Sequence, residues 1–339
     1  MIMACSHASR FRSALILVLG IVSLIALTAL SLAIDKTFIS FREVAQALWQ
    51  PDMSDINHIL INTTRLARTL VALVVGACLA VAGGLMQAMT RNPVASPGLF
   101  GINAGAVFFV VFFSAASGVS TTGHMMQLAF LGAAVAGLLV SGFGMMNRAH
   151  FSQLRLVLAG VAVTALFTSF TQALLVVNQE GLDNILFWIA GSVTGREGDA
   201  IGVVYPYILA AFAVSLLLAR HINILVAGEV VARGLGQNTV VIRALISLIV
   251  IILAGSAVAL AGNIAFIGLI VPHLVRHLLP HDFRWLLPGY ALFGAVLLLL
   301  SDILARTLLN PQEMPIGVVT ALAGAPFFIY LARKGMRNG

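Results

Sequence analysis

The chain has 339 residues, of which 60% are hydrophobic and 9% charged, and its formal net charge is +7. Soluble domains carry about a quarter charged residues, so this composition excludes a soluble enzyme built around one large core. Repeated apolar runs that could each cross about 30 Å of hydrocarbon predict a polytopic membrane protein. A membrane β-barrel is excluded because the alternating ten-residue segments that it needs are absent.

About ten apolar segments are predicted to form transmembrane helices, which makes the fold class all-α. The first of them follows Arg10 and Arg12 and is longer than the apolar region of a signal peptide, so we interpret it as a retained helix. We expect a single transmembrane domain over residues 1–339. The predicted helices lie near residues 14–34, 69–90, 100–117, 125–146, 154–177, 201–219, 243–261, 264–278, 286–308 and 316–332.

The basic residues predict the orientation, because cytoplasmic loops of membrane proteins carry an excess of arginine and lysine. With the N-terminus in the cytoplasm and alternating helices, the cytoplasmic side receives 13 of the 19 basic residues. It receives only two of the 12 acidic residues, Glu229 and Asp282. Both termini are therefore expected in the cytoplasm. Because the basic residues are spread over short loops, they do not predict a nucleic-acid-binding surface.

Two of the predicted helices are short or interrupted, in Thr90–Gly101 ("TRNPVASPGLFG") and in Asn263–His277. In the first, Asn92 is suited to cap a helix with Pro93 at its first position, and Pro97–Gly98 breaks the chain again. A tight cytoplasmic turn is the alternative interpretation of this segment. Irregular backbone at membrane depth is tolerated only where it is buried in protein or lines a cavity. Interruptions at corresponding positions predict two inverted-repeat halves around a transport path.

The segment Gly228–Gly236, "GEVVARGLG", places charges between two apolar runs on the predicted cytoplasmic side. Read as a helix, it pairs Glu229 with Arg233 in the favoured i, i+4 order. Gly234 and Gly236 are suited to ending that helix. The segment is interpreted either as a solvated loop helix with a local ion pair or as a contact surface for a partner protein.

Three long motifs resemble the FecCD family of permeases, the membrane subunits of ABC importers for iron–siderophores, haem and cobalamin. They are "RLARTLVALVVGACLAVAGGLMQAMTRNPVASPGLFGINAGA" (Arg65–Ala106), "GNIAFIGLIVPHLVRH" (Gly262–His277) and "PIGVVTALAGAPFFIYLARK" (Pro315–Lys334). The resemblance covers nearly the whole chain. It implies ten helices with both termini in the cytoplasm, the arrangement that the charge distribution also predicts.

The chain lacks a P-loop, since neither of its lysines, Lys36 and Lys334, stands in G-x-x-x-x-G-K-[ST]. We therefore expect a transport subunit without enzymatic activity, with ATP and Mg²⁺ bound by a partner ATPase. No cofactor or metal site is predicted in this chain, because His273 and His277 lack the glutamate of H-E-x-x-H sites. The resemblance places Gly228–Gly236, within the cytoplasmic loop 221–242, where such permeases contact their ATPase.

At the outer side, the resemblance implies that Arg65, Arg68 and Arg306 grip acidic residues of a periplasmic or lipid-anchored substrate-binding protein. The alternative is interfacial snorkelling combined with an i, i+4 pair between Asp302 and Arg306.

The resemblance also implies a cytoplasmic gate at Ser152 and Gln153. A plain helix N-cap at Ser152 explains the serine equally well.

The predicted function is the permease subunit of a binding-protein-dependent ABC importer in the cytoplasmic (inner) membrane of a bacterium. The expected cargo is a ferric siderophore, carried by alternating access between two copies of this chain or between it and a homologous permease. Haem or cobalamin is the alternative cargo within the family. An ion-coupled secondary transporter is the alternative from another class, and the scarcity of ionisable residues within the spans disfavours it.

Overall fold

The computed structural model describes residues 2–35, 37–52, 54–117, 122–145, 153–177, 190–193, 198–309 and 312–337, and all structural statements below concern these residues. Within them the chain forms helices joined by turns and short linkers, with one isolated β-bridge between Ile34 and Phe38. The all-α fold class is confirmed.

Each of the ten predicted segments has a helix at its place. Six helical spans are long and apolar enough to cross a membrane, and α9 with α10, bent by 55°, form a seventh candidate. Three further apolar helices, α5, α13 and α15, are shorter. That all ten segments cross the membrane stays a prediction. The helices are α1 (Ile2–Ala33), α2 (Phe41–Trp49), α3 (Ile56–Leu60), α4 (Leu66–Thr90), α5 (Ile102–Ser117), α6 (Thr122–Met145), α7 (Gln153–Val177), α9 (Gly198–Leu217), α10 (Ala219–Ala227), α11 (Glu229–Gly234), α12 (Thr239–Ala261), α13 (Ile267–Leu278), α14 (Phe283–Thr307) and α15 (Ile316–Arg337), with a π turn at Ile61–Arg65 and a 3₁₀ turn at Pro97–Phe100.

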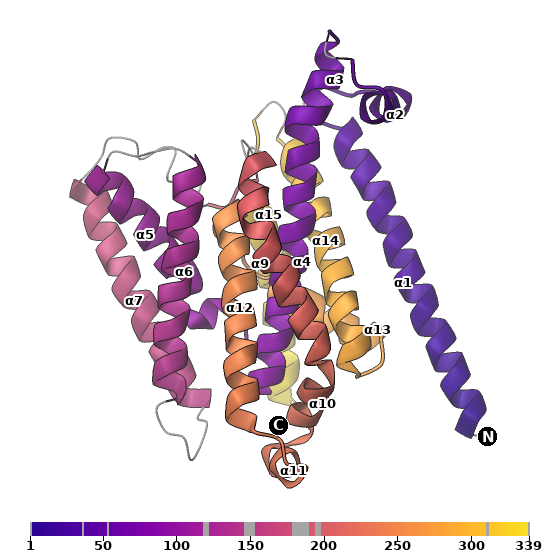
Figure 1. Cartoon of the computed structure of the whole chain (residues 1–339). Coiled ribbons are helices and arrows are strands. Elements are labelled where there is room, and N and C mark those ends of the chain that lie inside the picture. Colours follow the sequence, from indigo (N-terminus) through magenta and orange to yellow (C-terminus); the bar gives the residue numbers. More distant parts are fainter. Residues whose placement is uncertain are drawn as a thin grey trace.

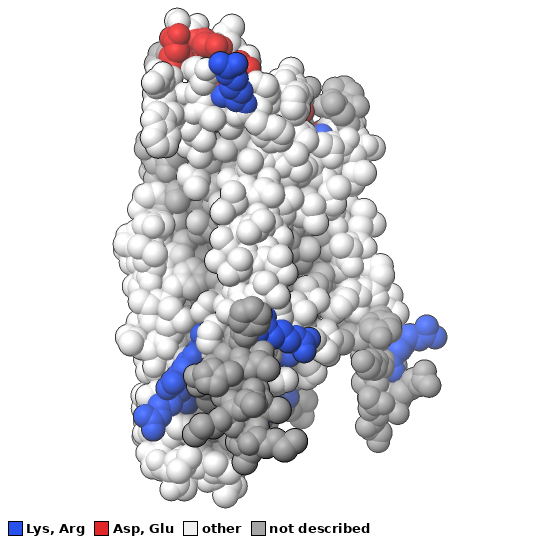
Figure 2. Space-filling model, turned by 90° about the vertical axis from the view of Figure 1, so that its right-hand side faces the viewer, with Lys and Arg blue, Asp and Glu red and all other residues white. Residues whose placement is uncertain are grey.

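Both chain ends lie at the same end of the bundle as α11, while α2 and α3 lie at the opposite end (Figure 1). On the face shown in Figure 2, the acidic residues gather at the end that carries α2 and α3. Arginine and lysine lie mainly at the other end, and a broad uncharged band separates the two. A band of this kind is suited to the hydrocarbon of a bilayer. That the α11 end faces the cytoplasm stays a prediction.

Glycines let α4 approach its neighbours at backbone distance. A Cβ at Gly76 would overlap the backbone of Gly294 in α14, and a Cβ at Gly83 would overlap the backbone of Gly268 in α13. Lipid is as apolar as a leucine side chain, so helices in membranes associate by close packing rather than by hydrophobic burial. These glycine pairs therefore fix where α13 and α14 lie against α4.

The first interrupted segment, Thr90–Gly101, contains a turn where a helix was one of the two interpretations. The Asn92 carboxamide oxygen accepts a hydrogen bond from the Val94 amide at 3.0 Å, which forms an isolated turn, and α5 does not begin until ten residues later. The structure therefore has the alternative, a turn, and not a helix that starts at Pro93, because Ser96 precedes a proline and is extended, which leaves no room for a helical turn. The predicted break at Pro97–Gly98 is confirmed, since a 3₁₀ turn begins at Pro97.

The second break is a linker, Gly262–Phe266, between α12 and α13. In both halves of the chain, a long helix is followed by a break and then by a shorter helix. Helix α4 runs toward the α11 end of the bundle and α12 runs away from it (Figure 1), so the two units point in opposite directions. This is the arrangement that an inverted repeat requires.

Candidate functional sites at the two ends of the bundle

The segment Gly228–Gly236 forms the tip of one end of the bundle, where α11 projects beyond the neighbouring helices (Figure 1). Gly228 begins it with φ 136° and Gly236 ends it with φ 77°, backbone conformations that favour glycine. The Gly236 amide donates to the Arg233 carbonyl and the Gln237 amide to the Ala232 carbonyl, both at 2.9 Å. These two bonds form a Schellman motif, which confirms the predicted helix and its glycine-dependent end.

One carboxylate holds α11 against the start of α12. Glu229 lies 2.7 Å from the guanidinium of Arg233, the predicted i, i+4 pair, and 3.1 Å from that of Arg243. The Arg243 side chain is 7% exposed, so this second ion pair is largely shielded from water. Sequence spacing alone did not reveal Arg243, because it reaches Glu229 across a turn that separates two helices.

The outer face of α11 is apolar and open. Val230 is 86% exposed and Leu235 66% exposed, whereas Ala232 is buried against the bundle. A Cβ at Gly234 would meet no atom within 4 Å. A pocket of about 260 Å³ lies at the same end of the bundle, and its lining includes Val226 at the end of α10. An exposed apolar helix beside a pocket is suited to contact with another protein.

Protonation of Glu229 should loosen α11. Burial by itself would raise the pKa of Glu229, but the hydrogen bond and positive charge of Arg243, with those of Arg233, outweigh it and hold the pKa below its ordinary value. The ion pairs are therefore fully present above the unfolded pKa of about 4.3 and are lost as the pH falls through the lower folded pKa. We expect amide exchange over 229–234, corrected for its intrinsic pH dependence, to stay constant from pH 8 to pH 5. Glu229→Gln should speed that exchange at neutral pH, and an unchanged rate would contradict the assignment.

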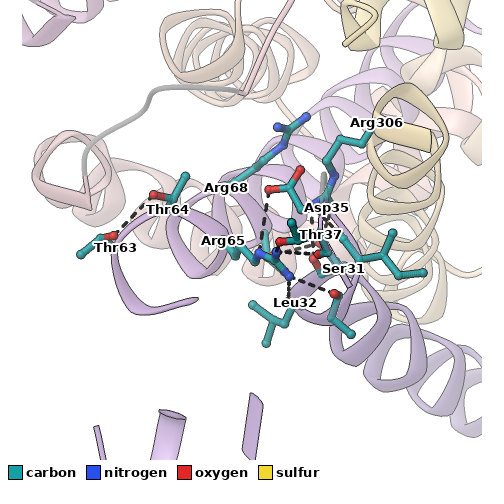
Figure 3. Close-up of polar contacts among 12 residues, drawn as sticks. Ser31, Leu32, Asp35, Thr37, Thr63, Thr64, Arg65, Arg68 and Arg306 are labelled. Atoms are coloured by element: carbon teal, nitrogen blue, oxygen red, sulfur yellow. Dashed lines mark hydrogen bonds and ion pairs between the residues drawn. The ribbon is translucent and has the colours of Figure 1, made fainter. Parts of the chain in front are cut away.

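At the opposite end of the bundle, the side chain of Arg65 caps the C-terminal end of α1 (Figure 3). Its guanidinium donates to the carbonyl oxygens of Leu32 and Ala33 at 2.8 and 2.9 Å. It also donates to the carbonyl oxygen of Thr37 at 2.8 Å, and the Asp35 carboxylate lies 3.8 Å from Nε. The last carbonyls of a helix have no partner within the helix, so this fully buried side chain satisfies groups that would otherwise be orphaned.

Arg68 and Arg306 share one carboxylate. Nε and Nη2 of Arg68 both donate to Oδ1 of Asp302 at 3.0 Å, and Nη2 of Arg306 lies 2.8 Å from Oδ2. Arg68 reaches Glu313 at 2.9 Å, and Arg306 reaches the hydroxyl of Ser31 at 2.7 Å. Asp302 is 0% exposed, so this cluster is a buried network that joins α1, α4, α14 and the chain before α15.

The three arginines are therefore not free charges on the surface. Arg65, Arg68 and Arg306 are 0%, 5% and 4% exposed, and their guanidinium groups are engaged within the chain. Arg68 pairs with Asp302 and Glu313, Arg306 pairs with Asp302, and helix-end carbonyls surround Arg65. The expected i, i+4 pair of Asp302 with Arg306 is confirmed. Docking of a binding protein on this end of the bundle stays a prediction.

The predicted gate falls at the edge of the described residues. Ser152 lies outside them, and Gln153 is the first residue of α7. The gate at these two positions stays a prediction.

Comparisons with known proteins agree with this architecture. The model of the FecCD transport family matches residues 23–334. The Bacillus subtilis protein named "Probable siderophore transport system permease protein YfiZ" is 45% identical over 335 residues, which is 99% of this chain and 100% of that protein. The Bacillus subtilis Fe(3+)-citrate import system permease protein YfmD is 42% identical over 97% of this chain and 98% of its own length. A solved metal-chelate type ABC transporter in an inward-facing conformation has a TM-score of 0.83 at 30% identity, over 94% of this chain and 99% of that chain.

An all-helical, multi-pass chain with these relatives is a permease of the ABC-importer class that serves iron-chelate uptake. Because the family model matches residues 23–334, the chain belongs to the FecCD transport family.

Proposed function

We propose that this chain is the permease subunit of a binding-protein-dependent ABC importer for ferric siderophores in the bacterial inner membrane. A partner ATPase binds ATP and Mg²⁺ and acts on Gly228–Gly236. A substrate-binding protein delivers the chelate to the end of the bundle that carries α2 and α3. Two permease chains, identical or homologous, enclose the path, and alternating access moves the chelate across.

The observation that carries the coupling proposal is the projecting helix α11. It exposes Val230 and Leu235, and glycines with positive φ hold its two ends in place. The ion pairs of Glu229 connect it to α12, a long helix in the centre of the bundle. Movement of α11 would therefore be transmitted to α12 and the rest of the bundle. A solvated loop helix without a partner protein would not need this connection.

Substituting Gly234 by tryptophan should abolish association with the ATPase while the permease still folds and inserts. The reason is that a Cβ at Gly234 would meet no atom within 4 Å, so a tryptophan is tolerated by this chain but occupies the surface proposed to contact the ATPase. Co-purification of the tagged permease with the ATPase measures the effect. Gly123→Trp is the matched control, since Gly123 also has open space around it but lies at the start of α6. Normal ATPase recovery with Gly234→Trp would overturn the coupling assignment.

Support for a siderophore comes from two Bacillus subtilis relatives, whose names concern siderophore and ferric citrate import. Haem or cobalamin remains the alternative cargo. Direct binding by the partner binding protein decides between them, because that protein contacts the cargo first. Tight binding of a ferric siderophore together with weak binding of haem and cobalamin is the expected result, and the reverse order would reassign the cargo.

A further inference from the structure

The linker Gly262–Phe266 is non-helical backbone that lies within the depth of the membrane. Helix α13 has 12 residues and is about 18 Å long, too short to cross about 30 Å of hydrocarbon. Its C-terminal end lies at the α11 end of the bundle, because Asn223 of α10 donates to Asp282, just before α14, at 2.7 Å. The linker at the other end of α13 must therefore lie inside the bilayer.

The linker is held in an unusual conformation. Gly262 has φ 71° and Phe266 has φ 69°, a left-handed conformation that a bulky aromatic residue rarely adopts. Helix α15 packs onto it through two glycines seven residues apart, which share one helix face. A Cβ at Gly317 would overlap the carbonyl oxygen of Ala190 and lie only 3.0 Å from that of Asn263, and a Cβ at Gly324 would overlap the ring of Phe266. Strained backbone of this kind persists where the surrounding structure fixes it, and it clusters at functional sites.

The start of α5, which follows the first interrupted segment, contacts this linker. The side-chain amide of Asn103, in the first turn of α5, donates to the side-chain oxygen of Asn263 across 160 residues of sequence. Asn103 follows the first break closely, and Asn263 lies in the second. Asn263 and Ala265 are nevertheless exposed in the single chain, so the amide pair forms a polar spot on the surface at membrane depth.

Lipid cannot satisfy such a surface. Exposed non-helical backbone and amide groups have no hydrogen-bonding partners in hydrocarbon, so they must be covered by protein or must line water. Carboxamides are uncharged and both donate and accept hydrogen bonds. They can therefore contact the oxygen atoms of a hydrophilic chelate without holding it by charge, and a transport path requires binding weak enough to release its cargo.

We propose that Asn103 and Asn263 line the aqueous path of the permease and that their carboxamides hydrogen-bond to the chelate as it passes. This inference rests on the proposed function and extends it by naming path residues.

Water access can be tested without any transport assay. Asn263→Cys is made in a background with Cys5→Ser and Cys78→Ala, reconstituted in liposomes, and treated with a charged, membrane-impermeant maleimide. Leu19→Cys is the matched control, because Leu19 is 56% exposed on α1, a helix with only 17% of its apolar window buried. We expect Asn263→Cys to react at least about tenfold faster than Leu19→Cys, since thiolate reactivity requires water. Equal rates would overturn the proposed path.

Contact with the cargo is tested by uptake of the ferric siderophore at saturating binding protein. We expect Asn263→Leu to lower the uptake rate about tenfold, the loss of roughly one hydrogen bond to a polar ligand, and Asn263→Gln to restore part of it. Fast labelling with an unchanged uptake rate in Asn263→Leu would overturn the cargo contact. The labelling depends on neither ATPase nor binding protein, so its failure is distinguishable from failure of the proposed function, which the Gly234→Trp co-purification tests.

Discussion

Replacing Asp302 by alanine is expected to lower the free energy of unfolding by about 3–5 kcal/mol. The carboxylate is fully buried and lies between the guanidinium groups of Arg68 and Arg306 at 3.0 and 2.8 Å. Without it, two buried cations remain close together, and Glu313 can neutralise only one of them. Replacing a whole buried ion cluster by apolar residues often changes stability little. Removing one partner alone is strongly destabilising, because the remaining charge is then buried without a counter-charge.

The measurement is reversible unfolding of the purified permease in mixed micelles, followed by the loss of helical signal as denaturing detergent increases. Arg233→Ala is the matched control, since Arg233 takes part in an ion pair with side chains that are 50% and 28% exposed. Exposed pairs contribute at most about 1 kcal/mol, so this variant should unfold near the wild-type midpoint. If Asp302→Ala unfolded within about 1 kcal/mol of wild type, the cluster would not stabilise this end of the bundle.

Because Arg68 and Arg306 lie in this buried cluster, a docking test that changes them must separate lost stability from lost contact. Charge reversal at Arg65, Arg68 and Arg306 would place three carboxylates in buried positions beside Asp302 and helix-end carbonyls. Loss of uptake in that variant would then report unfolding of the end of the bundle that carries α2 and α3 rather than lost contact with a binding protein. Stability of each variant has to be measured before its uptake rate is interpreted.

The membrane architecture could be predicted from two constraints. A segment in lipid must satisfy its own backbone hydrogen bonds, which favours helices, and it must be long and apolar enough to cross the hydrocarbon. The α11 segment could be predicted because its two glycines and its i, i+4 ion pair are local features. The family resemblance added the expected partners and the expected sites. These inferences needed only short-range sequence patterns or long, specific motifs.

The rest depended on contacts between distant residues. Arg68 and Asp302 are 234 positions apart, and no local pattern shows that they meet, so the sequence does not reveal that Arg68 lies in a buried ion pair. Helix α2 was missed because its nine residues are too short for a membrane span. Its local signal was present in the sequence, since Ser40 caps the helix by accepting a hydrogen bond from the amide of Glu43.

Substituting Gly83 by alanine is expected to destabilise the bundle by about 1–3 kcal/mol or more, although alanine favours helices over glycine by about 1 kcal/mol. A Cβ at Gly83 would overlap the backbone of Gly268, which cannot move as a flexible side chain can. The same carbonyl of Gly268 accepts a hydrogen bond from Gln87 at 3.2 Å, so displacement of α13 would also lengthen that bond. Because α13 follows directly from the Gly262–Phe266 linker, the change should also disturb the region proposed to line the path.

The matched control for this prediction is Gly142→Ala in α6, where a Cβ would meet nothing within 4 Å. That variant keeps the gain in helix propensity without the overlap, so it should be as stable as wild type or more so. Both variants are compared in the same detergent unfolding assay, and Gly83→Leu extends the series to a larger side chain. A loss of stability that grows from alanine to leucine at position 83, with none at position 142, would establish that the backbones of α4 and α13 must touch. Equal stability of Gly83→Ala and Gly142→Ala would mean that α13 can move away from α4 at little cost, and the fixed position assigned here to the linker would then be wrong.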